Sequence, residues 1–169
     1  MERIEEMTAV RAAVPQALRA LTTVSRFAEW MAPDVDLTPH THGDTLGPGD
    51  RFELRVLGLD VSYLVEAVSE REVVFSFSGP WSGRERWSFI ADGADTLVRR
   101  TYEVEDGSPA AVLAWRTVGR FLVLAHLKYE LARFRSLVEA DPGARGEIES
   151  GSRELPPPPS TSSFPIDEG

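Results

Sequence analysis

Three polar residues on one predicted hairpin, Glu85, Arg100 and Tyr102, have side chains suited to proton transfer. If the chain turns at residues 92–95, Glu85 pairs with Tyr102 and Trp87 pairs with Arg100, so that all of them share one face. A carboxylate, a guanidinium and a phenol in a dry pocket could orient a ligand and move a proton during an aldol-type ring closure or a dehydration. Glu85 and Arg100 could instead be occupied with each other as an ion pair, which is the preferred interpretation.

The histidines do not predict a metal site. His40 and His42 would share one face of an extended strand and could supply two zinc ligands, but no third ligand is placed near them. His126 belongs to a predicted helix far along the chain, and there is no cysteine, which excludes disulfides, thiolate nucleophiles and cysteine-bound zinc. We expect neither a metal nor a cofactor.

A long predicted helix over residues 109–140 organises the elements that must position these groups. Ser108 can cap it, Pro109 suits its first position, and the sequence Asp-Pro-Gly at residues 141–143 ends it. Its second half has an apolar stripe that is suited to lying on a sheet. The stripe consists of Leu124, Leu127, Leu131, Phe134 and Val138.

The first half of this helix has its apolar face on another side, rotated by more than a quarter turn, while Arg116 and Arg120 continue the later stripe. A break near Gly119 would bring both faces to one core and is the preferred interpretation. A straight helix would point both arginines toward the sheet, where they would favour a carboxylate or phenolate ligand. It would also leave an outer patch suited to a homodimer contact. That patch is made of Trp115, Val118 and Leu122.

Period-two alternation from residue 51 onward predicts antiparallel strands. A hairpin with Gly58 and Leu59 in its loop would place apolar pairs on one face. These pairs are Phe52 with Val65, Leu54 with Tyr63, and Val56 with Val61. A strand over residues 73–78 places Phe75 and Phe77 together, and the hairpin at residues 92–95 also pairs Phe89 with Val98.

The preceding segments complete an α+β fold. We predict a strand over residues 3–12, short helices over residues 14–21 and 24–31, and an edge strand over residues 34–42. The result is a curved antiparallel sheet of about seven strands wrapped around the long helix, with two short helices after the first strand. Because a bent sheet cannot touch a rod along its whole length, a hollow suited to a ligand remains between them. Trp81, in a loop, could be its lid or a packing plug.

Composition sets the remaining limits. The chain has 169 residues and a formal net charge of −9, which argues against binding nucleic acid or anionic lipid surfaces. No signal peptide and no run of eighteen apolar residues is found, so we expect a cytoplasmic protein without membrane insertion. Residues 1–141 form one predicted domain. Residues 142–169 form an acidic, proline-rich tail, expected to be disordered, that could also be a peptide ligand for a partner.

Four stretches together resemble the START-like helix-grip superfamily (SRPBCC), and most closely its polyketide cyclase/dehydrase branch. The first three stretches are a helix pair ending at Trp30, the glycine turn Gly-Pro-Gly-Asp-Arg-Phe at residues 47–52, and the Trp-Ser-Phe strand at residues 87–89 with its Asp-Gly turn and Thr-Leu-Val return. The fourth is the helix end at residues 127–134. Such motifs identify a fold better than an activity.

The resemblance implies a cavity for a hydrophobic small molecule such as a lipid or a polyketide. Some members of the superfamily cyclise or dehydrate polyketides, some only carry ligands, and a related branch binds a chaperone. We expect the cavity to be lined by Trp30, Leu54, Tyr63, Phe75, Phe77, Trp81, Trp87, Phe89, Arg116, Arg120, Val123 and Leu127. Three hypotheses follow: a carrier protein, an enzyme using Glu85, Arg100 and Tyr102, and an interaction module using the Trp115 face or the tail.

Overall fold

The computed structural model describes residues 2–56, 58–106 and 109–141. One antiparallel sheet has seven strands in the order β1-β7-β6-β5-β4-β3-β2. The strands are β1 (Glu2–Val10), β2 (Val35–His40), β3 (Arg51–Val56), β4 (Leu59–Val68), β5 (Glu72–Ser78), β6 (Ser82–Asp92) and β7 (Asp95–Asp106). The helical segments are α1 (Val14–Thr22), the 3-10 turn η1 (Val24–Arg26), α2 (Phe27–Trp30), α3 (Pro109–Ala114), the π-helical turn η2 (Trp115–Gly119) and α4 (Arg120–Ala140).

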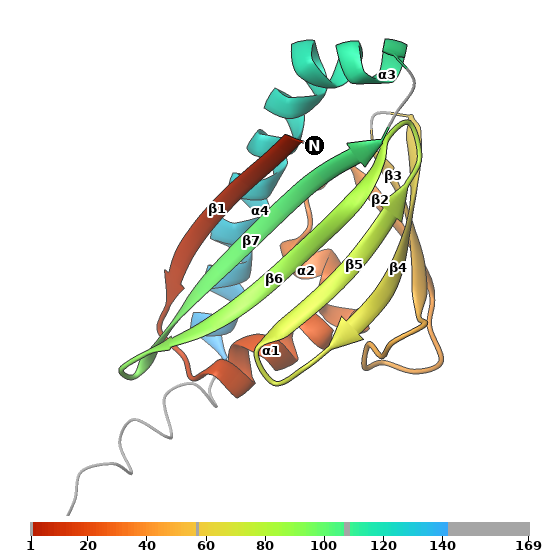
Figure 1. Cartoon of the computed structure of the whole chain (residues 1–169). Coiled ribbons are helices and arrows are strands. Elements are labelled where there is room, and N and C mark those ends of the chain that lie inside the picture. The colour runs from red at the N-terminus through yellow and green to blue at the C-terminus, as the bar shows by residue number, and fades with distance from the viewer. Residues whose placement is uncertain (1, 57, 107–108, 142–169) are drawn as a thin grey trace, which may run out of the picture.

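The sheet curves around α4, and α1 and α2 close one end of the space between them (Figure 1). This arrangement confirms the predicted α+β fold, with its two short helical segments after the first strand. The division into a domain over residues 1–141 and a tail stays a prediction, because residues 142–169 lie outside the described residues.

The β6–β7 hairpin has the predicted register. Its pairs include Glu85 with Tyr102, Trp87 with Arg100, and Phe89 with Val98. The register predicted for β3 and β4 is wrong by two residues. The observed pairs are Phe52 with Tyr63, Leu54 with Val61, and Val56 with Leu59. Leu59 belongs to the strand rather than the loop, and the turn uses Gly58 at φ 79°, a backbone conformation that glycine adopts without strain. Because the register shifts by two residues, every side chain stays on its predicted face of the sheet.

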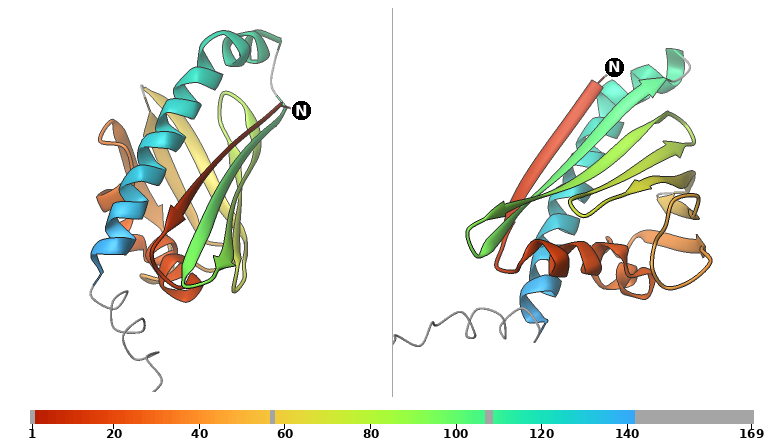
Figure 2. Two further views of the ribbon diagram at one scale, coloured as in Figure 1. Left: turned by 90° about the vertical axis from the view of Figure 1, so that its left-hand side faces the viewer. Right: turned by 60° about the horizontal axis from the view of Figure 1, so that its bottom comes forward.

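The long helix bends where its first half meets its second, as α3 leaves the line of α4 in Figure 2. The turn between them, η2, is π-helical, and one extra residue per turn shifts the phase of a helix by about 100°. That shift brings Trp115 inward, where it is 1% exposed. Gly119 is the last residue of the turn, and a Cβ there would lie 3.1 Å from Trp115 Cε3, so a glycine lets the Trp115 ring pack closely against the helix. The straight-helix alternative, with its outward Trp115, is therefore wrong.

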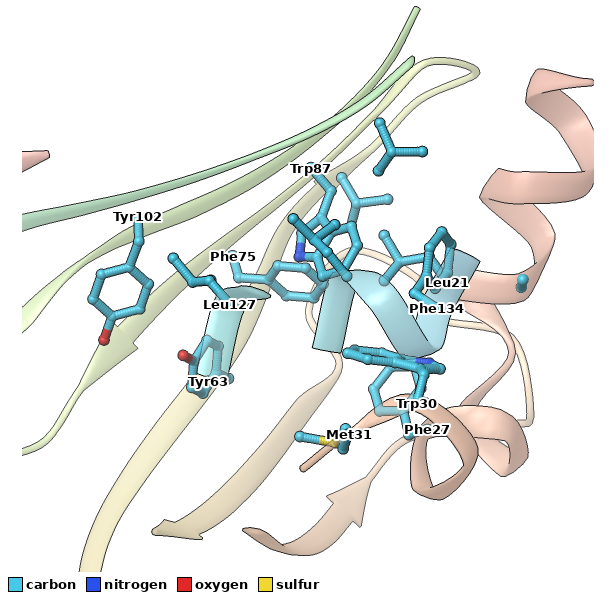
Figure 3. Close-up of a cluster of buried hydrophobic side chains, with 14 of the residues drawn as sticks. Leu21, Phe27, Trp30, Met31, Tyr63, Phe75, Trp87, Tyr102, Leu127 and Phe134 are labelled. Atoms are coloured by element: carbon cyan, nitrogen blue, oxygen red, sulfur yellow. The ribbon is translucent and has the colours of Figure 1, made fainter. Parts of the chain in front are cut away.

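The second half of α4 packs as its apolar stripe predicts. Leu127, Leu131, Phe134 and Val138 are each at most 3% exposed, and α4 contacts β1, α1 and α2. The Phe134 ring lies 5.3 Å from the Trp87 ring, centroid to centroid. We call this region the packed end of the molecule, and Figure 3 shows its close-packed side chains around Phe134.

The helical run Pro109–Ala140 contains a window of 18 residues with a mean hydropathy of 1.3, of which 17% is buried. Its length and composition are enough to cross a membrane, although the sequence has no unbroken apolar run of that length. A mostly buried core helix of a soluble protein passes the same test, and here one face of the second half of the run is buried in the fold. Membrane insertion therefore gains only weak support from this helix.

Candidate functional site

A cavity of about 110 Å³ lies between α4 and the sheet, where its lining includes Trp81, Tyr102 and Gly119 near the helix bend. A water molecule needs roughly 10–15 Å³ measured in this way, so the cavity has room for several water molecules or for a small ligand. It is lined by seven of the residues predicted from sequence, which are Leu54, Tyr63, Trp81, Arg100, Tyr102, Val123 and Leu127. Its walls are mostly apolar, as in small-molecule sites. We call this region the hollow end.

Arg100 on β7 is the polar centre of the site. Its Nε donates to Glu85 Oε1 at 2.7 Å, and its Nη1 donates to Glu130 Oε2 on α4. The side chains of Arg100, Glu85 and Glu130 are 9%, 4% and 5% exposed. Arg100 therefore makes two buried ion pairs, one with Glu85 within the sheet and one with Glu130 that ties the sheet to α4. We call these three residues the Arg100 cluster.

Glu85 is held behind Arg100 and away from the cavity. Its carboxylate accepts hydrogen bonds from Trp87 Nε1 at 2.6 Å and from the Tyr63 hydroxyl at 3.2 Å, besides Arg100. It borders a separate void of about 20 Å³, which has room for about one water. Glu85 accepts three hydrogen bonds and is part of the buried polar network of the fold. The predicted ion pair between Glu85 and Arg100 is present.

The surroundings of both tyrosines and of Arg100 favour their ordinary protonation states. Burial raises the pKa of Tyr63, and the nearby Glu85 charge raises it further. Burial also raises the pKa of Tyr102. For Arg100, burial alone would lower the pKa, but Glu85 and Glu130 together raise it above its usual value. The wall of the cavity thus offers neutral phenols and a cation that is paired with Glu130, a carboxylate in the same wall.

Trp81 and Tyr102 form the upper wall beside the helix bend. Trp81 Nε1 donates to the Tyr102 hydroxyl at 3.2 Å, and the Trp81 ring packs on Trp115 with centroids 5.3 Å apart. Tyr102 is also stacked on Phe77, at 4.4 Å. Trp81 is partly buried and lines the cavity, so it serves as wall and as packing at once.

Several residues predicted to line the cavity lie elsewhere. Trp30, Phe75 and Trp87 border the smaller void next to the packed end, and Phe77 and Phe89 are core residues. Figure 3 shows Tyr63 and Tyr102 on one side of this cluster and Trp30 with Phe134 on the other. The cause is that α1, α2 and α4 fill this end of the space with side chains.

Arg116 and Arg120 do not face the cavity. Arg116 Nε donates to Glu2 Oε1 at 2.8 Å on the outside, with 64% of the Arg116 side chain exposed, and this bond lowers the pKa of Glu2. Arg120 is exposed. The π-helical turn that brings Trp115 inward carries both arginines out, so the predicted cationic lining is wrong.

The histidines each pair with a single acid. His42 Nδ1 lies 2.9 Å from Asp50 Oδ1, and His126 Nε2 lies 3.1 Å from Asp34 Oδ2. His40 lies 3.9 Å from Glu53. Within residues 2–56, 58–106 and 109–141, no three His, Asp or Glu side chains gather as metal ligands.

Sequence reasoning missed nine lining residues, most of them apolar. They are Met31, Val35, Val56, Leu59, Val61, Gly119, Leu122, His126 and Glu130. Glu130 was the most informative of these. It follows Leu127 by three residues and precedes Phe134 by four, so it lies within the buried stripe of α4. A carboxylate at such a position requires a buried partner, a signal in the sequence that was not used, and in the structure that partner is Arg100.

No family model matches the sequence, and no curated protein matches it. Solved structures with a similar fold include TTHA0849 from Thermus thermophilus, which is 17% identical, with 81% of this chain and 97% of that chain covered and a TM-score of 0.66. Ara h 8.0201 is 11% identical over 83% of this chain and 99% of that chain, with a TM-score of 0.61.

DynU16, a protein of the dynemicin biosynthetic locus, is 15% identical and has a TM-score of 0.61. The match covers 83% of this chain and 48% of that one, so this chain spans about half of DynU16. At such low identities the likeness shows the fold alone: this chain has a helix-grip fold.

Proposed function

We propose that this protein binds a small, largely apolar molecule in the cavity between α4 and the sheet, as a binding or carrier protein. The observation that carries the proposal is a hollow of about 110 Å³ with apolar walls and a few buried polar groups at one side. A void of this size costs the fold stability, because its lining loses packing contacts. Its presence beside a tightly packed core supports a ligand-binding purpose.

The ligand class follows from the walls and from the resemblance. Tyr63, Trp81 and Tyr102 line the cavity with aromatic rings, which suit flat or aromatic bodies. The sequence resembles the polyketide cyclase/dehydrase branch, and DynU16, of similar fold, comes from the dynemicin biosynthetic locus. We therefore propose an aromatic or polyketide-like ligand rather than a long-chain lipid.

Binding without chemistry is preferred over a cyclase or dehydratase activity. Of the three predicted catalytic residues, Arg100 and Tyr102 line the cavity and Glu85 does not. Three donors already occupy Glu85, and Arg100 is occupied by two carboxylates. A general base needs access to the proton that it removes, and this arrangement gives none through Glu85.

Native mass spectrometry of the purified protein tests the proposal, with the expected result a co-purified small molecule. Val123→Trp on α4 should fill the cavity and abolish that adduct, since Val123 lines it. Ala132→Trp, on the exposed face of the same helix, should retain the adduct. Equal adducts in both variants, with both folded, would contradict binding in this cavity.

A homodimer is a second candidate property, favoured by the apolar side chains exposed around the helix bend. Leu113, Val118 and Phe121 are 64%, 57% and 67% exposed, and Leu122 beside them is 39% exposed. Such a patch is typical of an interaction surface. Trp115 is not part of it, because its ring is buried. We expect the wild-type chain to sediment as a dimer and Phe121→Asp as a monomer; a monomeric wild type would remove this candidate.

A further inference from the structure

The charges around the cavity do not balance. Among the described residues that line it, Arg100 is the only arginine or lysine, and it is paired with two carboxylates, Glu85 and Glu130. The Arg100 cluster therefore has a formal charge of −1 when its three groups are ionised. His126, also in the wall, is paired with Asp34, so this second pair is neutral or negative. The summed formal charge of these two groups of residues is negative in either case.

Glu130 is the carboxylate that a ligand can reach. It lines the cavity, whereas Glu85 lies behind Arg100. One oxygen of Glu130 accepts from Arg100 Nη1, and the other accepts from the Ala32 backbone N–H at 3.3 Å. A carboxylate has about four acceptor positions, and these two bonds use half of them. Glu130 can therefore accept a further donor from the cavity side.

We propose that the ligand carries a positively charged amine on its apolar body, and that the cavity rejects the matching carboxylate. An ammonium group would complete the charge balance of the Arg100 cluster by bonding to Glu130, where a low dielectric strengthens the attraction. The aromatic rings of Tyr63, Trp81 and Tyr102 in the same wall also favour a cation. A carboxylate would meet uncompensated negative charge, since Arg116 and Arg120 lie outside. This inference rests on the proposed function, because it concerns the ligand of the same cavity.

Three probes with one apolar body separate charge from shape: 4-phenylbutylamine, 4-phenylbutanol and 4-phenylbutyrate. Their affinities are measured by isothermal titration calorimetry at pH 7 and low ionic strength, where screening is weakest. We expect the amine to bind more tightly than the carboxylate by roughly tenfold or more, with the alcohol between them.

Glu130→Gln tests whether Glu130 sets this preference, since it removes one charge and keeps the shape. The ratio of amine to carboxylate affinity should fall by roughly fivefold or more. Glu53→Gln is the matched control: it changes the net charge equally at a side chain that is 62% exposed, and the ratio should not change. Because Glu130 is buried, Asp34→Asn gives a second variant with less risk to the fold. Its carboxylate is 46% exposed, and its smaller effect should have the same sign.

The outcomes separate this inference from the proposed function. If the alcohol binds and the amine shows no advantage over the carboxylate, the inference is overturned and the proposed function stands. An equal fall of the ratio in Glu53→Gln and Glu130→Gln would also overturn it, because long-range charge would then explain the preference. If no probe binds, the neutral alcohol included, the proposed function itself is contradicted.

Discussion

The packed end and the hollow end of this fold lie on one helical run, yet they differ in nearly every physical respect. At the packed end, the Phe134 ring is 0% exposed and sits among the rings of Trp30 and Trp87. At the hollow end, Phe121 is 67% exposed, and its neighbours Leu122 and Val123 border a cavity. The difference teaches that side chains fill one end of the fold and leave a cavity at the other.

The largest effect should come from comparing a phenylalanine at each end. Phe134→Ala should lower the free energy of unfolding by about 3–5 kcal/mol, because it leaves a hole among close-packed rings. Phe121→Ala should change it by about 0.5 kcal/mol or less at a protein concentration low enough to keep the chain monomeric, because the side chain is exposed. Chemical denaturation of both variants measures the difference, and similar losses would show that the two ends do not differ in packing.

A buried and an exposed arginine extend the comparison to ion pairs. Arg100→Met should cost about 3–5 kcal/mol of unfolding free energy, since it leaves Glu85 and Glu130 buried without their cation. Arg116→Met should cost about 1 kcal/mol or less, because its pair with Glu2 is solvent-exposed. Urea denaturation of the two variants compares them. If Arg100→Met left the free energy of unfolding unchanged, the two buried ion pairs would add no stability at this site.

A smaller effect is expected at Asp50, which precedes β3 outside both ends. Its side chain is 6% exposed, and its pKa is lowered by the His42 ring and by the Gly47 backbone N–H. Asp50→Asn should cost about 1–2 kcal/mol at pH 7 through these bonds. A lowered folded-state pKa gives stability that is present above the unfolded pKa and is lost as the pH falls through the folded one. The deficit of the variant should therefore shrink below about pH 4 in thermal melts. A deficit that is constant with pH would argue against ionised Asp50 as its source.

The sequence predicted the architecture well because its signals were local and repeated. Alternation fixed the face of each strand, and the Asp-Gly turn after β6 fixed the Glu85–Tyr102 register. The β3–β4 register was missed by two residues, since either position of the glycine in the loop keeps the same apolar face. That ambiguity is intrinsic to a pattern with period two.

The site was predicted less completely because it depends on how the helix is placed. A single π-helical turn decides whether Trp115 or Arg116 faces the sheet, and no composition rule places such a turn. The sequence also did not show which part of the space is filled by side chains. Trp30 and Phe89 are aromatic, as are Trp81 and Tyr63, but only the latter pair borders the cavity. Which end of the space is filled by side chains depends on where α1 and α2 pack against the sheet and α4.

The most direct test of the two-ended fold is a two-dimensional amide NMR titration with the neutral probe 4-phenylbutanol. The account predicts saturable shifts at the hollow end, at the amides of Tyr63, Leu122 and Val123, with little change at Phe134 or Val138 of the packed end. Shifts centred on the packed end, or no saturable shifts at all, would contradict a ligand site in this cavity.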